Sequence, residues 1–517
     1  MMIILKSHHL PTALRSYGAA SMLALTMTLN TSTPQAIAQI APARLAPARL
    51  ERTESEIDAA ALVLGEPAYG PTHYGQNING AAFQDAVTSF AGWQYVVYYH
   101  GARQLCLSRR RLPDGAWQTM RFSGYEFKTN DAHNVASVGI SPRDGTIHLA
   151  YDGHGVAPTW FRASRAGIAT KPEAVAWDET LFGPQTGGVE AGKHLKSITY
   201  PRYFCAPDGA LQLSYRTGGS GTGELWFVDY NAQTGQWENS RQIDTREGSW
   251  TDVPGSALSL TRSSYANGFD YAPDGSLHTT WTWRENNPVG NRDIAYAASS
   301  DRGFTWKNNA GQVIAHAKPG SVADVMGMNS PGIVVVPISR RDGMINTQAQ
   351  AIDSRGRVHL VISHVTPQSV RAAGFKYPGA ATWGAPAALR YHHYMRQSDG
   401  KWAHLELPGV AGGRGWLGFD ARDTAYFVHL DRPTPVSTLD KDEIYFTASM
   451  SVHVATAKAN YRDWHVAYRE AGPFLSEFRP DTARLKSEGV LSIYAQRAAA
   501  KGVFSSALSV IDLKIKP

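Results

Sequence analysis

The sequence predicts an all-β protein, namely a seven-bladed β-propeller with four-stranded antiparallel blades. Three observations support this prediction: a short strand pattern returns seven times, tight turns precede several copies, and an aromatic marker runs in step with them. Alternating apolar and polar residues behind a tight turn are typical of a hairpin strand. Most neighbouring copies lie about 65 residues apart, so each repeat has the length of one small sheet, as in a propeller.

The repeated strand pattern gives one expected strand for each blade. Three copies follow an Asp-Gly turn, at Asp144-Gly145, Asp208-Gly209 and Asp274-Gly275. The interval between the fourth and fifth copies is longer than the others, and we interpret residues 320–337 within it as a long loop over one face. The seven copies are residues 94–99, 146–151, 210–215, 276–281, 357–362, 424–428 and 490–494.

The aromatic marker is a turn that contains Gly or Asp and is followed by Trp. Its strongest copy, residues 299–306, matches the full Asp-box S-x-D-x-G-x-T-W. In such a hairpin the Asp side chain bonds the turn backbone, the Gly takes a positive φ and the Trp packs between neighbouring sheets. We therefore expect it to be structural, on the outer hairpin of a blade. The other copies end at Trp117, Trp237, Trp402 and Trp464.

Length and composition fit one large closed domain, which we place at residues 61–517. The 517 residues are enough for several average domains, but the repeat favours a single one. Gly (48), Tyr (23) and Trp (14) are plentiful, as turn-rich and aromatic-packed blades require. Charged residues make up 18%, so long disordered stretches are not expected, and no long amphipathic helix stands out.

The N-terminus predicts a secretory signal peptide over residues 1–38. Lys6 and Arg15 make a basic start, residues 18–29 are a short apolar core, and residues 36–38 form an A-x-A cleavage site. The apolar core is too short to span a bilayer, and no later stretch is apolar for long enough. Residues 39–60 are expected to be a flexible lead-in. The mature protein is therefore predicted to be exported, to the periplasm or the medium.

Cysteine usage and charge say little about partners. An oxidising compartment permits a disulfide between Cys106 and Cys205, but two buried free thiols fit as well. The net charge of +6 is weak support for an anionic polymer as the binding partner. Because no block of Lys and Arg is present, nucleic acid is a poor partner. We expect a monomer.

The second and third repeats contain the candidate catalytic residues His133, His154, Tyr200 and Arg216, each at a strand start or end. In a propeller such positions line the axial mouth. Each residue also has an ordinary structural interpretation. An imidazole can bond local backbone, a tyrosine can pack between blades, and a buried arginine can belong to an ion pair.

Taken together, two imidazoles, a phenol and a guanidinium suit proton abstraction next to a carboxylate. A guanidinium on the C6 carboxylate of a uronic acid stabilises the charge that develops when the C5 proton is lost. A tyrosine or histidine removes that proton, and another group protonates the departing O4. This is a β-elimination, which leaves an unsaturated sugar and consumes no water.

These segments resemble the exported BNR-repeat polysaccharide lyases of families 24 and 25, which cut ulvan. The matching pieces are residues 131–134, 152–155, 199–201 and 214–220, in the same order and with similar intervals. The resemblance implies that His133 and His154 lie in the catalytic pocket and that Arg216 neutralises the carboxylate. It implies Tyr200 as a general base or acid, and it leaves open whether Tyr200 or His133 abstracts the proton.

The resemblance also implies substrate contacts and a substrate class. Asn134 and Arg284 are expected to contact substrate, and glucuronic acid linked to rhamnose is the expected target. No cofactor is expected to be required for catalysis. Some relatives carry a structural metal ion, but its ligands are not placed here, and the pair His392-His393 is too weak a cluster to define a site.

Two other functions stay open at this point. A sialidase-like glycoside hydrolase would need an acidic pair, which Asp131 and Asp152 offer, but no Arg-Ile-Pro segment lies near the N-terminus. A non-catalytic glycan-binding propeller would explain the aromatic residues but not the grouping of His, Tyr and Arg. Ultraviolet absorbance from a new C4–C5 double bond, together with chain shortening, separates all three.

Overall fold

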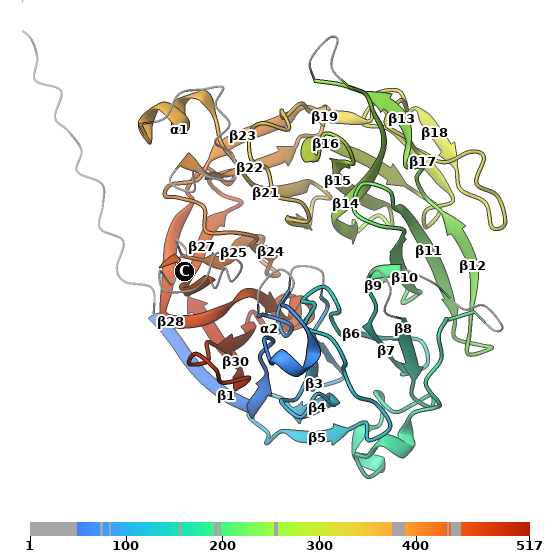
Figure 1. The fold of residues 1–517 in the computed structure, drawn as a ribbon, viewed down its shortest axis with the longest axis vertical. Helices are drawn as coiled ribbons and strands as arrows, with labels where there is room; N and C mark the ends of the chain where they lie inside the picture. Colours follow the sequence, from blue (N-terminus) through green and yellow to red (C-terminus); the bar gives the residue numbers. More distant parts are fainter. Residues whose placement is uncertain are drawn as a thin grey trace, which may run out of the picture. The chain divides into compact units, whose positions relative to one another are not determined.

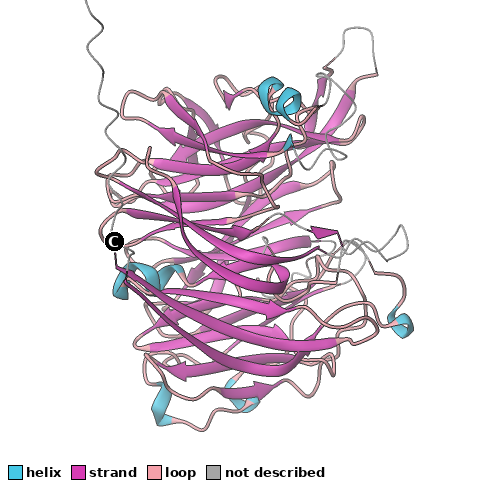
Figure 2. Cartoon of the chain, turned by 90° about the vertical axis from the view of Figure 1, so that its left-hand side faces the viewer, coloured by secondary structure: helices cyan, strands magenta, loops and turns pink. Residues whose placement is uncertain are grey.

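The computed structural model describes residues 49–72, 76–81, 84–154, 158–190, 195, 198–252, 257–374, 388–431, 434–435 and 446–516. The predicted signal peptide, residues 1–38, lies outside the described residues. The all-β prediction is confirmed, because the strands pair in antiparallel ladders throughout and the helices are short. Figure 2 shows that strands dominate the described chain, with helical turns between them.

Six hydrogen-bonded sheets contain all the described strands. Three have the four strands that the sequence predicts: β2 (Val87–Phe90) to β5 (Gln118–Arg121) through β3 (Trp93–Tyr99) and β4 (Leu105–Arg111); β9 (Ile198–Cys205), β10 (Leu211–Thr217), β11 (Glu224–Asn231) and β12 (Gln236–Gln242); and β20 (Ala349–Ile352), β21 (Val358–His364), β22 (Arg390–Arg396) and β23 (Trp402–Glu406).

The other three sheets depart from four strands. One has three: β6 (Ser137–Ile140), β7 (Ile147–Asp152) and β8 (Thr159–Ala163). One has seven: β13 (Glu247–Trp250), β14 (Ser259–Tyr271), β15 (Leu277–Glu285), β16 (Gly290–Ser299), β17 (Thr305–Lys307), β18 (Val313–His316) and β19 (Val334–Val336). The last has eight: β24 (Trp416–Phe419), β25 (Thr424–Leu430), β26 (Thr434–Pro435), β27 (Phe446–Thr456), β28 (His465–Pro480), β29 (Leu491–Arg497), β30 (Ser505–Lys516) and β1 (Arg49–Leu62).

The helices are short connectors. They are α1 (Pro367–Ala372), α2 (Thr482–Glu488) and the 3-10 turns η1 (Pro67–Tyr69), η2 (Pro172–Ala174) and η3 (Glu179–Leu181). Thr366 caps α1 through a reciprocal bond with Ser369, and Asp481 caps α2 through the Arg484 amide. Among the described residues no helix is long and apolar enough to cross a membrane.

Each predicted strand copy is present and is an inner strand of its sheet, from β3 and β7 to β29. The alternation does not produce an exposed face, however, because every residue of β3, β21 and β25 is buried. The reason is that each sheet packs against its neighbours on both sides. One apolar cluster, for example, joins Tyr95 and Val97 of β3 to Leu149 and Tyr151 of β7.

The predicted turns form as the sequence indicates. Gly145, Gly209 and Gly275 all take positive φ after their aspartates. In the Asp-box, Asp301 accepts a hydrogen bond from the Thr305 amide at 2.7 Å, and Trp306 is fully buried. This hairpin is structural, as expected.

Contacts between sheets form a closed series (Figure 1). One strand of each sheet touches the next in the order β2, β6, β9, β14, β20 and β24, and α2 touches both β24 and β2. In an antiparallel sheet, the start of the first strand and the end of the second lie at one edge. The starts of β6, β9 and β24 therefore share an edge with the ends of β7, β10 and β25. This edge carries the residues considered below.

Two expectations from the sequence are corrected. Residues 49–60 of the expected flexible lead-in belong to β1, which pairs with β30 from Arg49↔Lys516 to Leu62↔Ser505. That segment is held by a long ladder whose partner lies at the other end of the sequence, so local composition gave no sign of it. The expected long loop at residues 320–337 contains β19, which pairs with β16. The two cysteines are free, with Cys106 buried in β4 and Cys205 at the end of β9.

Candidate active site

Asp131 holds both predicted histidines with one carboxylate. Its Oδ1 accepts from the His133 amide at 3.0 Å and lies 2.5 Å from His133 Nδ1. Its Oδ2 lies 2.6 Å from Nδ1 of His154, which follows β7. The two rings consequently stack with centroids 4.1 Å apart and planes 19° apart. One anion thus fixes both imidazoles through the same ring nitrogen.

The protonation states follow from burial and hydrogen bonding. Burial would raise the pKa of Asp131, but hydrogen bonds from His133 and His154 outweigh it and hold that pKa well below its usual value. Burial also lowers the pKa of His133, although Asp131 opposes this shift. At neutral pH Asp131 is therefore an anion and His133 a neutral imidazole. With its Nδ1 proton directed at Asp131, His133 carries its lone pair on Nε2.

Tyr200 reaches the same place through a β-bulge. Ser214 of β10 pairs with Arg202 of β9, and Arg216 pairs with Thr199, so two residues of β9 face one of β10. Tyr200 takes a φ of +56° there, a conformation that costs about 1 kcal/mol or more for a residue other than glycine. Its ring lies 6.1 Å from that of His133 and 6.4 Å from that of His154.

Arg216 is a buried guanidinium without a hydrogen-bond acceptor. Its exposed fraction is 3%, and none of its three side-chain nitrogens has a partner among the described residues. Its charge instead faces two aromatic rings, with Cζ 4.8 Å from the centroid of Tyr200 and 4.4 Å from that of Tyr265. Buried charges are normally paired, so this guanidinium is available to bind an anionic ligand.

Tyr265 of β14 completes the group and was not identified from the sequence. Burial would raise its pKa, but the charge of Arg216, the contact with Ser220 and the charge of Arg284 together outweigh burial, so the pKa of Tyr265 lies below its usual value. For Tyr200 burial prevails and raises the pKa well above the usual value. The two phenols, 6.1 Å apart, therefore differ in how readily they release a proton.

Arg414 approaches from a distant part of the chain. Its guanidinium donates to Asn346 O and Oδ1, both at 2.7 Å, and to Glu477 at 3.0 Å. Its charge lowers the pKa of both His133 and Tyr200. The loop before β24 therefore contributes positive charge to this edge of the molecule, a second feature that sequence reasoning missed.

The two expected substrate contacts have different surroundings. The side-chain Nδ2 of Asn134 donates to Asp152 at 2.7 Å and to Thr129 at 3.1 Å, while its buried side-chain Oδ1 has no partner among the described residues. Arg284 of β15 is half-buried, and its charge lowers the pKa of Tyr265. Asn134 is thus part of the supporting network, and Arg284 adds charge beside the two phenols.

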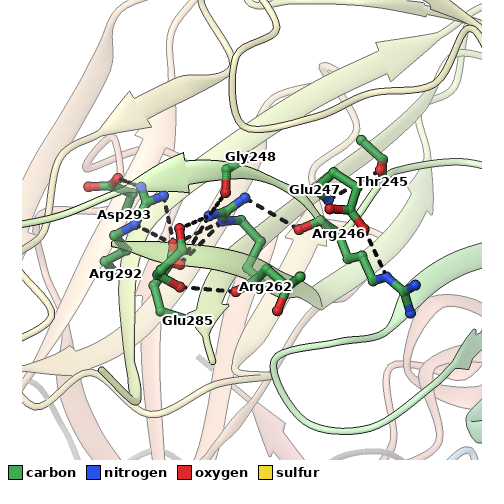
Figure 3. Close-up of polar contacts among 10 residues, drawn as sticks. Thr245, Arg246, Glu247, Gly248, Arg262, Glu285, Arg292 and Asp293 are labelled. Carbon is green, nitrogen blue, oxygen red and sulfur yellow. Dashed lines mark hydrogen bonds and ion pairs between the residues drawn. The ribbon is translucent and has the colours of Figure 1, made fainter. Parts of the chain in front are cut away.

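A buried ion cluster is centred on Glu285, the residue that follows Arg284 in β15 (Figure 3). Glu285 is fully buried and binds Arg262 at 3.0 Å and Arg292 at 2.8 Å. Arg262 also donates to Gly248 O at 2.9 Å, and Arg292 lies 4.3 Å from the Trp250 ring centroid. The cluster thereby ties β13 to β14 and β15. Unlike Arg216, these arginines have carboxylate partners.

Metal ligation was left open by the sequence. Asp131, His133 and His154 offer ligand atoms within 4.8 Å of one another, the only such group of three among the described residues. The same atoms already form the two carboxylate–imidazole contacts described above. His392 and His393 point to opposite faces of β22, toward His404 and His359 respectively, and so do not form one ligand set.

The structure brings the four predicted residues into one group around Asp131, Tyr265 and Arg414. Their catalytic roles stay predictions. Asp131 had a local signal, since Asp131 and His133 are spaced as in a turn where a carboxylate bonds the amide two residues on. Tyr265 and Arg414 had no signal that separated them from structural residues.

Residues 93–408 match the family model described as a BNR repeat-containing family member. The long isoform of ulvan lyase from Alteromonas sp. (strain LOR) is 27% identical over 303 residues, covering 48% of this chain and 28% of that protein. The short isoform from the same strain is 26% identical over 203 residues, covering 32% and 38%. The chain thus spans well under half the length of these relatives.

Two solved structures share the fold. The polysaccharide lyase Uly1 superposes with a TM-score of 0.62 at 19% identity, covering 90% of this chain and 99% of that one. An ulvan lyase of family PL25, bound to -[GlcA(1-4)Rha3S]-, gives a TM-score of 0.60 at 12% identity, covering 88% and 95%. These matches confirm the resemblance that the sequence motifs indicated.

Proposed function

The chain belongs to the BNR repeat-containing family, and from this premise we propose that it is a polysaccharide lyase that cleaves the bond to C4 of a uronic acid by β-elimination. The observation that carries the proposal is Arg216, a buried guanidinium for which the described residues provide no hydrogen-bond acceptor. A substrate carboxylate supplies that acceptor. It also places the C5 hydrogen of the sugar beside His133 and Tyr200, whose rings lie 6.1 Å apart.

In the proposed reaction Arg216 binds the C6 carboxylate and stabilises the negative charge that spreads onto it when C5 loses its proton. The C5–H electron pair forms the C4–C5 double bond, and the C4–O4 bond breaks. O4 leaves with a proton from the protein. The products are an unsaturated uronate and a shortened chain with a new hydroxyl.

We assign the base to His133 and the acid to Tyr200. The lowered pKa of His133 keeps its imidazole neutral, with a lone pair on Nε2. The raised pKa of Tyr200 keeps its phenol protonated, as a proton donor to O4 must be. Asp131 orients His133 and stabilises the imidazolium that forms. His154, on the other carboxylate oxygen, shares that orienting anion.

The proposed substrate is glucuronate linked to rhamnose. The relatives in the comparisons are ulvan lyases, and one related structure is bound to a glucuronate–rhamnose 3-sulfate repeat. Arg284 adds positive charge near Tyr265 and Arg414 adds positive charge near Tyr200, which suits an anionic polymer. We further propose that the protein is exported as a monomer through the signal at residues 1–38.

We also infer seven blades from the six sheets. In the eight-stranded sheet, β28 pairs with β27 from Val454↔His465 to Thr447↔Leu475, and with β29 from Phe474↔Arg497 to Pro480↔Ile493. This 16-residue strand therefore belongs to two blades in turn. One holds β24, β25 and β27, and the other holds β29, β30 and β1. The shared strand explains why hydrogen bonding alone groups them together.

A glycoside hydrolase has weaker support. Asp131 is held by two imidazoles, and Asp152 accepts from Tyr125 and Asn134 while burial raises its pKa. Both carboxylates are thus already bonded to protein groups, whereas the acid and base of a hydrolase must be free to act on the substrate. A non-catalytic glycan-binding protein remains the second candidate, because the same arginine would also bind a uronate without turning it over.

One assay tests the proposal. The mature protein is incubated with ulvan and with other uronate polymers, and ultraviolet absorbance and chain length are followed together. Absorbance with chain shortening is the expected result. Chain shortening without absorbance indicates a hydrolase, and neither change indicates a binding protein, so either outcome would overturn the proposal.

A further inference from the structure

One cavity outside the candidate active site lies where β25 ends and β27 begins. Its volume is about 760 Å³, enough for a sugar ring. We name it the β25 pocket. Its polar and aromatic lining comprises Tyr391, His429, Asp431, Ser449, His453 and Arg469, and its apolar lining includes Pro408, Val410, Val466 and Pro473.

Two buried imidazoles in this lining have unused nitrogens. His429 and His453 have exposed fractions of 3% and 4%. His429 Nδ1 bonds the Leu430 carbonyl, whereas His429 Nε2 and His453 Nδ1 have no hydrogen-bond partner among the described residues. Buried polar atoms are nearly always paired. Two unpaired nitrogens in one cavity therefore indicate a ligand with hydrogen-bonding groups.

The chemistry of the missing partner follows from the protonation of these rings. Burial lowers the pKa of His429 to about 3 and that of His453 to about 4, so both are neutral at neutral pH. Because His429 Nδ1 must carry the proton to bond a carbonyl, His429 Nε2 accepts. The ligand must donate to it, as a hydroxyl group does.

The charged residues of the pocket balance each other. Asp431 accepts from Arg469 at 2.9 Å and from Ser451 at 2.6 Å. The guanidinium of Arg469 is thus already paired, in contrast to that of Arg216. A cavity with hydroxyl acceptors, a neutralised ion pair and apolar walls suits an uncharged sugar ring, whose C–H face packs on Pro and Val side chains.

The β25 pocket and the candidate active site share one loop. Gly412 packs so closely on the Leu430 and Asp431 carbonyls that a side chain at position 412 would overlap them. The Tyr391 hydroxyl accepts from the Gly412 and Gly413 amides, both at 3.1 Å, and Tyr391 lines the pocket. The next residue is Arg414, whose charge acts on His133 and Tyr200. A polymer lying along this edge passes both places.

We propose that the β25 pocket binds a neutral sugar residue of the same polysaccharide whose uronate binds at Arg216. This inference rests on the proposed function and extends it by a second, chemically distinct subsite.

The test uses the full chain with ¹³C-labelled histidine and two separate probes, rhamnose and glucuronate, observed by NMR. Rhamnose is expected to shift the ring signals of His429 and His453, assigned through His429→Gln and His453→Gln. Glucuronate is expected to shift those of His133 and His154. If rhamnose leaves the His429 and His453 signals unmoved up to its solubility limit, the pocket holds only water and the inference is overturned.

A double variant provides the second measurement. Asp431→Ala with Arg469→Ala removes the ion pair without changing net charge, and Arg469 is largely exposed, so the fold is expected to survive. Beyond their mutual contact, the Asp431 carboxylate can still accept and the Arg469 guanidinium can still donate hydrogen bonds to sugar hydroxyls. Without both groups, rhamnose affinity should fall about 5-fold to 10-fold, the worth of one or two hydrogen bonds, and KM for polymer should rise in parallel. Asp399→Ala with Lys401→Ala, another surface pair, is the matched control and should change neither. Unchanged rhamnose affinity in the folded Asp431/Arg469 variant contradicts the inference.

The two proposals fail in different ways. A protein that cleaves uronate polymers but whose His429 and His453 signals ignore rhamnose overturns only the pocket inference. A protein whose signals respond to rhamnose but which produces no unsaturated uronate overturns only the lyase assignment.

Discussion

Two closely stacked imidazole pairs in different regions of the molecule have different surroundings. His133 and His154 stack with centroids 4.1 Å apart, and His364 and His392, on β21 and β22, stack at 3.8 Å. The first pair shares a carboxylate and lies beside Tyr200, whose ring also faces a guanidinium without an acceptor. The second pair has its nitrogens bonded to protein groups.

The bonds of the second pair are complete. His364 bonds Val365 O at 3.0 Å and the Tyr394 hydroxyl at 2.9 Å. His392 contacts His404 at 3.0 Å and His364 O at 3.3 Å. Proximity of imidazoles therefore does not identify a site. The distinguishing feature is a buried charge that has no hydrogen-bond acceptor in the described part of the chain.

The largest expected effect is on the reaction rate, and it distinguishes Tyr200, beside the first imidazole pair, from Tyr394, beside the second. Tyr200→Phe should lower the rate of double-bond formation about 10²-fold to 10⁴-fold, because it removes the proposed proton donor. Tyr394→Phe, which removes only a bond to His364, should leave the rate per folded molecule unchanged. Initial rates of ultraviolet absorbance measure both. Near-normal turnover by Tyr200→Phe would remove that residue from the mechanism.

Two buried arginines provide the next contrast. Arg216→Ala should lower the rate about 10²-fold to 10³-fold, because charge on the carboxylate is no longer stabilised, and should change thermal stability little. Arg262→Ala leaves Glu285 with one fewer cation and should cost about 3–5 kcal/mol of unfolding free energy. Urea unfolding and rates are measured on both variants. If Arg216→Ala unfolds the protein, then Arg216 is structural and the comparison fails.

Exchanging the imidazoles themselves sharpens the comparison. His133→Gln should lower the rate about 10²-fold or more, since a glutamine cannot act as a base. His392→Gln should lower the free energy of unfolding by about 1–3 kcal/mol, because His404 and the His364 carbonyl lose a buried partner, while the remaining folded protein keeps its rate. The same effect of both variants on rate would mean that the second region also takes part in the reaction.

Acid should destabilise the protein through the buried pair His364 and His392. Burial lowers the pKa of His364 to about 4 and that of His392 to about 2. An unfolded imidazole titrates near pH 6.5, so below about that pH the unfolded chain binds protons that the folded chain does not. Stability is therefore complete above about pH 6.5 and falls as the pH drops, by up to about 1.4 kcal/mol per pH unit for each group. Urea midpoints measured downward from neutral pH should fall less steeply in His392→Gln, and equal slopes would contradict this.

The smallest expected effect is that of metal removal. Because Asp131 already bonds both imidazoles, dialysis against a chelator should leave the rate unchanged. Metal analysis of the purified protein and rates before and after dialysis are the measurements. A rate that falls on dialysis and returns with one divalent metal would place an ion at Asp131, His133 and His154.

The elements that sequence alone predicts are those with a local cause. The Asp-Gly turns, the Asp-box and the seven repeated strands each depend on neighbours in the chain. The grouping of His133, His154, Tyr200 and Arg216 was predictable because these residues fall at comparable positions of adjacent repeats. Their arrangement in space then follows from the repeat.

The remaining features depend on distant pairings. The bulge that exposes Tyr200 to the site is set by the register of β9 on β10, which no single segment encodes. Arg414 reaches the site because Asn346 and Glu477 hold it, far away in sequence. The ladder between β1 and β30 likewise has no local signal. For this reason the sequence predicted a flexible lead-in as far as residue 60, although residues 49–60 belong to β1.

That ladder also sets the order in which the molecule can be completed. Residues 63–504 separate strand β1 from its partner β30, so the edge of β1 stays unpaired until this whole segment and β30 itself have been synthesised. Exposed edges of this kind invite pairing with other chains. A circular permutant that joins these two strands by a short turn would form the ladder as an ordinary hairpin. The strand edge that stays unpaired longest during synthesis would then belong to another sheet.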